Sequence, residues 1–300
     1  MKSRYAPDRG LSSRMALTMV LLGLVYVLLM AVLIAAGVAW PFVLVISVGI
    51  AWVQWYFSDK IALHGMGARV VTEQEAPQLH AIVDRLCALA DMPKPRVAIS
   101  DSDVPNAFAT GRGRDQAVVC VTTGIMRRLD EAELEGVLAH ELSHVAHNDV
   151  TVMTIASFVA VMAGFLTRMA MWGGLGDRRR NDQNTAMLMI AVVLVSVVVY
   201  FLSYLLIRAL SRYRELAADR AGAMLTGRPS ELASALVKVS GEMARIPTRD
   251  LRHAQAYNAF FFAPALTPGF SISSMFATHP PLERRLDQLT KIAAQLGRGA

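Results

Sequence analysis

The sequence predicts a predominantly helical α+β protein that is anchored in a membrane by four helices. Of its 300 residues 54% are hydrophobic and the mean hydropathy is +0.39, which is too apolar for an ordinary soluble enzyme. Four long stretches carry almost no charge and fall into two pairs. Between and after these pairs the chain has the patterns of soluble helices and short strands. We therefore expect transmembrane hairpins at residues 1–57 and 150–207, and a soluble unit in two parts at residues 58–149 and 208–300.

The first pair of apolar stretches covers residues 15–40 and 41–57, and neither contains a charged residue. Gly37 and Pro41 interrupt the run, so we expect two spanning helices in a tight hairpin. A cleaved signal peptide is the alternative for the first stretch, because basic residues precede it. The stretch is longer than the apolar core of a signal peptide, however, and a second one follows at once.

The soluble segment 58–149 should form a small α+β unit. Thr72 and Glu75 make a capping-box pattern ahead of a helix that extends to about residue 90. Short strands are expected at residues 96–100, 107–110 and 116–122. A turn at Gly124 should follow the last strand.

The second strand of this unit is a candidate for binding a polypeptide substrate. We expect Asn106, Ala107 and Phe108 to hold an extended peptide by edge-strand addition, which binds the main chain and tolerates varied sequences. The alternative for Asn106 is a turn residue that follows Pro105.

The next helix carries the most informative motif of the chain, His140-Glu141-Leu142-Ser143-His144. Asp130 and Glu133 make a capping box at its start. Histidines at i and i+4 project from one helix face and can reach one metal ion, while Glu141 lies about 100° round the helix, next to the attacking water. The alternative is a pair of core histidines satisfied by hydrogen bonds. Paired polar residues inside an apolar helix favour a zinc hydrolase site.

The second pair of apolar stretches, residues 150–172 and 186–207, follows the motif directly, and Arg168 is its one charged residue. The linker 173–185 would make these two helices a hairpin, so the chain enters and leaves the membrane on the same side. Alternatively, such helices line the core or a chamber of a large protein.

That geometry would bring the helix after the fourth span to the motif. Glu215 and Asp219 lie on this helix, and Gly222 and Ala223 on the same face would let it approach another helix closely. Catalytic zinc typically has three protein ligands and an open position, so Glu215 would complete a set with the two histidines. Asp219 would accept the outer N–H of a ligand histidine and hold its tautomer. The alternative for both acids is an exposed helix with arginine partners.

The C-terminal segment should contain a helix that begins near Pro229 and another after Pro281. Between them, residues 249–276 show no clear period around Phe260-Phe261-Phe262. This stretch would cover the active site, dip into the membrane interface or form a buried strand around Phe261, and the strand is the most economical of the three.

Taken together, these motifs resemble a known family. His140-Glu141-x-x-His144 followed by Glu215-x-x-x-Asp219 is similar to the zinc-binding pattern of gluzincin metallopeptidases. The hairpins around it resemble the HtpX family of bacterial heat-shock membrane proteases, which are relatives of the CAAX prenyl proteases. The runs Pro-Asn-Ala-Phe-Ala-Thr-Gly at 105–111 and Thr-His-Pro-Pro-Leu-Glu-Arg-Arg at 278–285 extend the likeness over nearly the whole chain.

The resemblance implies a zincin-like membrane endopeptidase that binds one Zn²⁺ per chain through His140, His144 and Glu215, with Glu141 as general base. It implies that Asn106 holds the substrate main chain and that His279 and Arg285 complete the site. His279 would donate a hydrogen bond to the substrate oxygen, and Arg285 would orient the supporting carboxylate or hold the carbonyl. The alternative is that His279 begins the last helix and Arg285 is solvated.

The family also implies a location and a role: the bacterial inner membrane, an active site that faces the cytoplasm, and stress-related cleavage of misfolded membrane proteins. The net charge of +6 is not accompanied by interleaved basic and aromatic residues, so no nucleic acid is expected as a partner. Basic flanks of the membrane helices explain the charge and favour a cytoplasmic site, although the cluster from Arg178 to Arg180 in the opposite loop argues against it. A specific processing protease and a non-catalytic zinc-binding scaffold are the other functions left open.

Overall fold

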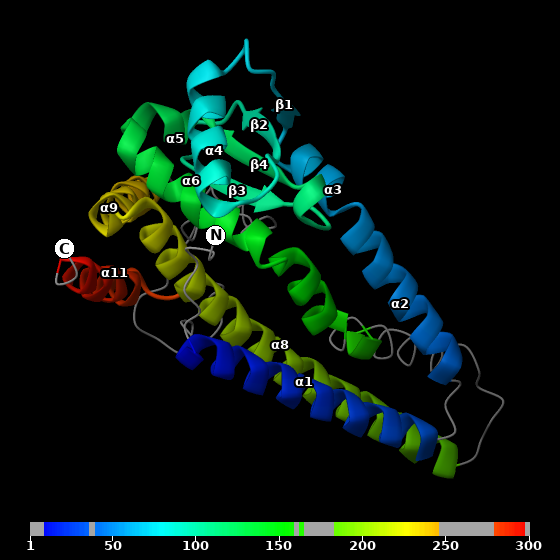
Figure 1. The fold of residues 1–300 in the computed structure, drawn as a ribbon. Helices are drawn as coiled ribbons and strands as arrows, with labels where there is room; N and C mark the ends of the chain where they lie inside the picture. Colours follow the sequence, from blue (N-terminus) through cyan, green and yellow to red (C-terminus); the bar gives the residue numbers. More distant parts are fainter. Residues whose placement is uncertain (1–8, 36–39, 159–161, 165–182, 246–278, 298–300) are drawn as a thin grey trace.

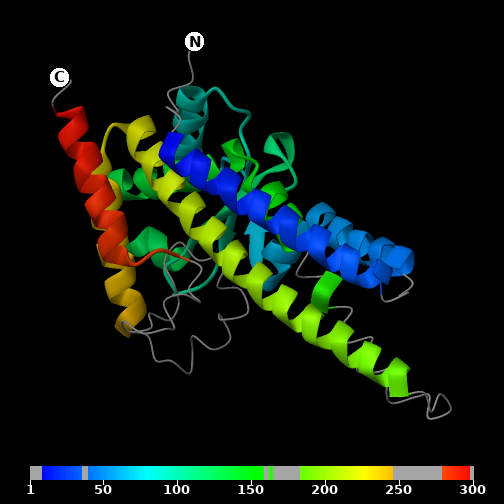
Figure 2. The same cartoon turned by 90° about the horizontal axis from the view of Figure 1, so that it is seen from below.

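A computed structural model of the chain describes residues 9–35, 40–158, 162–164, 183–245 and 279–297. Figure 1 shows a small sheet covered by helices at one end of the molecule and long helices that extend away from it. The same arrangement seen from below shows α1 and α8 running side by side over most of the length of α1 (Figure 2). The chain therefore has a mixed α+β unit joined to a helical part, as the sequence predicts.

The α+β unit is built on a four-stranded sheet in the order β1-β2-β4-β3. The strands are β1 (Ala68–Val70), β2 (Arg96–Ser100), β3 (Ala107–Thr110) and β4 (Val118–Thr122). β2 and β4 are parallel, while β1 and β3 pair antiparallel at the two edges. The three predicted strands are confirmed, except that Arg114–Gln116 form a 3-10 turn before β4. The short β1 was not predicted, because three residues are too few for a period to be visible.

Helices α4 (Pro77–Ala90) and α5 (Thr123–Arg128) differ from the prediction at their starts. Thr72 and Glu75 do bond to each other, at 2.8 Å from the Thr72 N–H, but in a turn before the helix. α4 begins later because Pro77 lacks an N–H and suits the first helical position. The turn predicted at Gly124 is wrong: Gly124 lies inside α5, which Thr122 caps by accepting from the Ile125 N–H.

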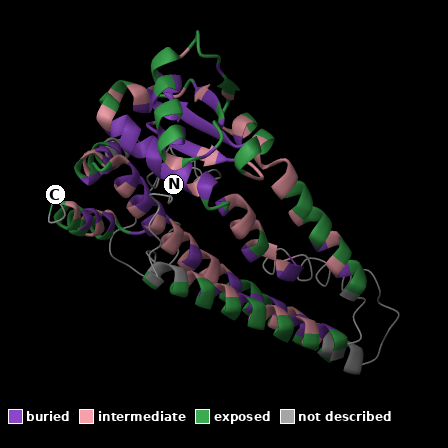
Figure 3. Ribbon diagram, viewed as in Figure 1, coloured by how far each residue is buried: buried purple, intermediate pink, exposed green. Residues whose placement is uncertain are grey.

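Helix α6 (Glu131–Ala146), which contains the motif, begins as predicted. The Asp130 carboxylate accepts from the Glu133 N–H at 2.9 Å, and the Glu133 carboxylate accepts from the Asp130 N–H at 3.1 Å. α6 lies in the centre of the main hydrophobic core, between the sheet, α4 and α9 (Pro229–Arg245). Figure 3 shows this burial as a nearly continuous purple band along α6. The motif thus lies on a helix that is buried in the main hydrophobic core.

Two described helices are long and apolar enough to cross a membrane by themselves, at Ser13–Ile34 within α1 (Arg9–Ala35) and Ile190–Thr226 within α8 (Gln183–Thr226). Two bent pairs would raise the number to four: α2 (Trp40–Tyr56) with α3 (Ser58–Gly65), and α6 with the helix that begins at Asp149. Four spans are therefore confirmed only in part. The outward side chains of α1 and α2 are apolar and exposed, as expected of surfaces that contact lipid (Figure 3).

The tight hairpin predicted for α1 and α2 is wrong. α1 packs along α8 instead, through a face that includes Thr18, Leu22, Leu29 and Leu33, and approaches α2 mainly near their connection. The reason is that one face of α1 is complementary to α8, whereas a short connection does not require two helices to pack along their length.

The C-terminal helices α9 and α11 (Leu282–Leu296) start at Pro229 and after Pro281, as predicted. Several expectations lie outside the described residues: the stretch 249–276 with its strand around Phe261, most of the linker 173–185, and much of the third apolar stretch, of which 149–158 and 162–164 are helical. The expected boundary at residue 207 falls inside the single helix α8.

Candidate active site

The two histidines of the motif project from the same face of α6. Their Nε2 atoms are 3.3 Å apart, and the rings meet edge to face. His140 is almost fully buried, while the side chain of His144 remains 13% exposed. The spacing of one helical turn thus directs both Nε2 atoms to a common point.

Glu215 reaches that point from α8. Its carboxylate oxygens lie 3.7 Å from His140 Nε2 and 3.5 Å from His144 Nε2. One ligand atom from each of the three residues lies within 4.8 Å of the others. Two imidazole nitrogens and one carboxylate oxygen are the donor set of many catalytic zinc sites. The chemistry of these residues fits a zinc ion.

α8 can bring Glu215 this close because its face is small where the two helices meet. A Cβ atom added at Gly222 would lie 2.9 Å from the backbone nitrogen of His140. Ala223 beside it is completely buried. The predicted role of these small residues in a close helix contact is confirmed.

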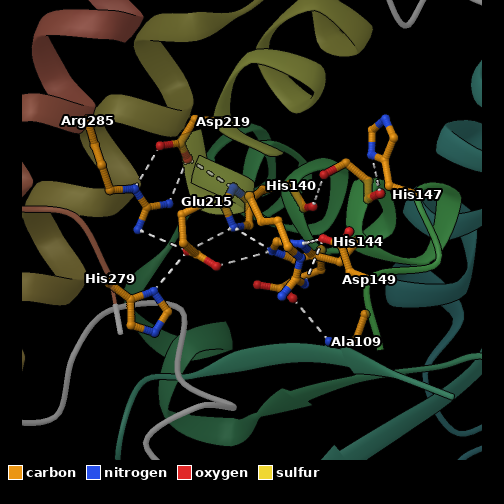
Figure 4. Close-up of polar contacts among 12 residues, drawn as sticks. Ala109, His140, His144, His147, Asp149, Glu215, Asp219, His279 and Arg285 are labelled. Atoms are coloured by element: carbon orange, nitrogen blue, oxygen red, sulfur yellow. Dashed lines mark hydrogen bonds and ion pairs between the residues drawn. The ribbon is translucent and has the colours of Figure 1, made fainter. Parts of the chain in front are cut away.

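A carboxylate and an arginine support His140 from behind (Figure 4). Asp219 Oδ1 lies 2.9 Å from His140 Nδ1. Arg285 on α11 donates to both oxygens of Asp219, at 2.8 Å from Nε and 2.6 Å from Nη2. Asp219 and Arg285 are both buried, so the solvated alternative for each is wrong. With Asp219 beside His140 Nδ1, the other ring nitrogen, Nε2, is the one that faces His144 and Glu215.

A second carboxylate supports His144 and was not predicted. Asp149 Oδ2 lies 2.5 Å from His144 Nδ1, and Arg214 Nη2 donates to the same oxygen at 2.7 Å (Figure 4). Asp149 is buried where the apolar stretch begins. An acidic residue at the start of an apolar helix, five residues after His144, was the signal that could have identified it.

Glu141 lies beside the triad and faces the sheet. It is buried, and its Oε2 accepts a hydrogen bond from the Ala109 N–H on β3 at 3.0 Å. Burial raises the pKa of this carboxyl above its usual value, against the opposing effect of the two histidines. A carboxylate with a raised pKa is suited to accepting a proton near neutral pH.

The carboxylates also act on His140. Burial works against a protonated imidazole, but Asp219 and Glu215 outweigh it and raise the pKa of His140 to about 9. Their field favours a positive charge at this point, whether it is a proton or a metal ion. This electrostatic preference is a second reason why the site fits a divalent cation.

His279 approaches Glu215 from the segment that precedes α11. Its Nδ1 lies 2.8 Å from Glu215 Oε2, and its Nε2 is buried without a hydrogen-bond partner among the described residues. Pro281 occupies the N-cap position of α11, so His279 lies before the helix and does not begin it. The prediction that the far end of the chain reaches the site is therefore supported by position.

The strand expected to bind substrate lies at the edge of the sheet, next to α6. Asn106 is fully buried, and its backbone bonds to Thr122 in both directions, which anchors the start of β3. The Phe108 side chain packs with Ala62 and Cys120 in a hydrophobic cluster, so it does not line the site. On this strand Ala109, which was not predicted, contacts Glu141 directly.

A protein-family model identifies the group to which these residues belong. The model described as "Peptidase family M48" matches residues 73–293. The chain belongs to peptidase family M48. The match includes α6, all of α8 and most of α11, and every residue of the triad and its supports lies within it.

Similar proteins over nearly the full length are named as proteases of the HtpX type. "Protease HtpX homolog 1" of Streptomyces coelicolor is 60% identical over 99% of this chain and 97% of its own length. "Protease HtpX homolog" of Moorella thermoacetica is 55% identical over 99% of both chains. "Protease HtpX homolog 2" of Methanosarcina acetivorans is 50% identical over 99% of this chain and its whole length. The HtpX resemblance read from the motifs is confirmed, and this M48 chain is a membrane protease.

Among solved structures, the fold resembles the crystal structure of S. mikatae Ste24p, with a TM-score of 0.54 and 18% identity. The likeness covers 91% of this chain but 63% of that one, so this chain spans less than two thirds of the other. At this identity the likeness concerns the fold alone.

Proposed function

We propose that this M48 chain is a zinc endopeptidase that cleaves misfolded or damaged membrane proteins. The observation that carries the proposal is the convergence of His140, His144 and Glu215 beside the buried Glu141 and an edge strand. A bound zinc ion lowers the pKa of water and polarises a carbonyl group. The remaining chemistry depends on the protein's own groups.

Glu141 acts as the general base. Its carboxylate is buried and held by the Ala109 N–H, so one oxygen is fixed while the other can accept a proton from the attacking water. The same carboxyl then gives the proton to the leaving amine. Its raised pKa makes both transfers accessible at neutral pH.

β3 binds the substrate. The strand occupies an edge of the sheet, so its outer main-chain groups can pair with an extended peptide. Asn106 precedes this strand and Ala107 begins it, and both hold the peptide main chain. Because the Asn106 backbone bonds to Thr122, its part in this falls to its side-chain amide. Main-chain recognition accepts many sequences, as a protease for unfolded segments requires.

His279 and Arg285 complete the site. When water adds to the peptide carbonyl, negative charge develops on its oxygen. A His279 ring with a proton on each nitrogen can donate from Nδ1 to Glu215 and from Nε2 to that oxygen. Arg285 acts through Asp219, which holds the His140 ring in orientation. Asp149 and Arg214 hold His144 in the same manner.

The substrates are reached at a membrane surface. α8 passes without a break from an apolar segment to Glu215, which places the site close to the bilayer. We assign the enzyme to the bacterial inner membrane with the site on the cytoplasmic face, because basic residues such as Lys60, Arg208 and Arg212 flank the membrane segments on that side. Misfolded membrane proteins expose the loops and tails that an edge strand can bind, which suits a role in stress responses.

The decisive experiment compares Glu141→Gln with the wild type in detergent. The variant should retain about one zinc per chain, because Glu141 is not a ligand, but lose cleavage of an unfolded substrate by orders of magnitude. Glu131→Gln, an exposed change at the start of the same helix, serves as the matched control. Substantial cleavage by Glu141→Gln would rule out the base assignment. A wild type that binds zinc but cleaves nothing would instead indicate a scaffold.

A further inference from the structure

The bend between α2 and α3 marks a boundary between apolar and charged surface. α2 carries exposed apolar side chains as far as Trp52 and Val53, which are 52% and 45% exposed. The chain then turns by 63° into α3, which starts with Ser58, Asp59 and Lys60. Aromatic side chains of tryptophan and tyrosine concentrate where a membrane meets water.

The aromatic residues at this bend are held in place. Trp52 stacks on Tyr56 at 5.0 Å between ring centroids, and Phe57 packs edge-on against Tyr56 at 4.9 Å. Trp55 donates to Thr151 Oγ1 at 2.9 Å, which ties α2 to the helix that begins at Asp149. The level of the membrane surface on α2 is therefore the same as on the helix that supports His144.

A cavity of about 320 Å³ opens between this bend and the sheet. Four cations line it, against two carboxylates: the lining includes Tyr56, Asp59, Lys60, Lys94, Arg96, Arg112 and Asp115. Lys94 forms ion pairs with Glu73 and Asp84, and Arg96 forms one with Asp59. The N···O distances in these pairs are at most 2.9 Å. These pairs shape the wall of the cavity and leave two cations for a ligand.

Those two cations are Lys60 and Arg112, which form no ion pair with any residue that the structure describes. The Arg112 guanidinium lies 4.2 Å from the Tyr56 ring centroid and donates to the Tyr56 carbonyl at 3.3 Å. Its other N–H groups remain available, because a guanidinium carries five. Lys60 lies over the Phe57 ring at 5.5 Å. Both cations are thus pre-positioned by aromatic rings at the membrane boundary.

We propose that this cavity binds the headgroup of an anionic phospholipid, with Arg112 and Lys60 on its phosphate. A phosphate suits a pre-positioned guanidinium because it can accept two parallel hydrogen bonds. The exposed apolar side chains of α2, which leads to Tyr56 in the cavity lining, would contact the acyl chains. A zwitterionic headgroup binds less well, since it carries no net negative charge for the two cations to attract.

The test measures lipid binding by the full-length protein in detergent, by native mass spectrometry with phosphatidylglycerol and phosphatidylcholine. The variant Lys60→Gln/Arg112→Gln removes both cations. The control Arg69→Gln/Lys291→Gln removes two exposed cations on β1 and α11. The wild type should prefer phosphatidylglycerol. The cavity variant should lose roughly 30-fold in affinity for it, about tenfold per 1.4 kcal/mol with about 1 kcal/mol per basic residue, while the control changes little.

Two further measurements keep the test decisive. Asp115→Asn removes a carboxylate from the cavity lining and should tighten phosphatidylglycerol binding, a gain that unfolding cannot mimic. Inorganic phosphate added in excess should not displace the lipid. Equal lipid affinity in the cavity variant and the control would overturn the proposal. Displacement by phosphate would show a site for a soluble anion instead and would equally overturn it.

Discussion

His140 and His144 each face a carboxylate that an arginine contacts. Each set of partners takes one member from α8, Asp219 or Arg214, and the other member from a different part of the chain. Behind His140, Asp219 and Arg285 are at most 2% exposed and belong to α8 and α11. Behind His144, the side chains of Asp149 and Arg214 are 6% and 12% exposed, and Asp149 begins the apolar helical segment that follows α6. One half of the site therefore depends on the C-terminal helix α11 and the other on the start of that apolar segment.

The largest effect should come from removing Glu215, whose carboxylate lies beside both His140 and His144. Glu215→Ala takes away the third ligand, so the protein should lose its metal and its activity by orders of magnitude. Metal analysis of the purified variant checks this, with Glu283→Ala at the exposed start of α11 as the control. Normal zinc content in Glu215→Ala would mean that the third ligand is another residue.

A somewhat smaller effect is expected at His279, and it tests whether the C-terminal part of the chain takes part in catalysis or only positions other residues. His279→Ala should lower turnover by about 10² to 10³, the scale of losing one oxyanion donor. The metal content should change much less, because His279 contacts Glu215 but does not belong to the triad. Steady-state kinetics and zinc analysis measure both quantities, and His279→Gln should recover part of the turnover. Full turnover in His279→Ala would remove the residue from the catalytic set.

Changing Asp219 and Asp149 in parallel tests whether the carboxylates that support His140 and His144 differ in their effect. Asp219→Asn and Asp149→Asn should each weaken metal affinity by roughly 10 to 100-fold, the usual penalty for a ligand histidine that loses its orienting carboxylate. Chelator competition measures this. Asp219→Asn should also lower the thermal midpoint more, because it removes the charge that faces the fully buried Arg285. Equal thermal midpoints would mean that the difference in burial has no energetic consequence.

The smallest effect is expected at the contact between α6 and α8, which brings Glu215 to the two histidines. Gly222→Ala puts a methyl group 2.9 Å from the His140 backbone nitrogen, so it should destabilise the protein by about 1–3 kcal/mol. Gly241→Ala is the matched control, because nothing lies within 4 Å of its added Cβ and alanine favours the helix. Thermal unfolding in one detergent compares them. Equal stability of the two variants would show that α6 and α8 can separate without cost.

The sequence predicted the carboxylate that supports His140 but not the one that supports His144. His140, Glu141, Glu215 and Asp219 follow helical spacing, so their positions on two faces could be read directly, and the small residue Gly222 indicated the contact between them. Asp149 was missed because it lies beyond the end of α6, after a residue with positive φ at Asn148 that redirects the chain. Periodicity does not extend across such a turn.

The same distinction applies to the fold. The strands β2, β3 and β4 and the starts of α6, α9 and α11 were predicted closely, since their apolar patterns and capping residues are local. The pairing of α1 with α8 was not, because it depends on complementary faces that are far apart in the sequence. The start of α4 was misplaced because Thr72 and Glu75 form the bonds of a capping box within a turn that precedes Pro77.

The unbroken course of α8 also sets the height of the reaction above the bilayer. Its apolar stretch ends at Ile207, and Glu215 follows about two turns later, a rise of about 12 Å. An extended chain advances about 3.3 Å per residue. On the proposed function, a polypeptide anchored in the same bilayer would need about four residues between its last lipid-embedded residue and the bond to be cut, so we expect well-inserted proteins with shorter free ends to escape cleavage.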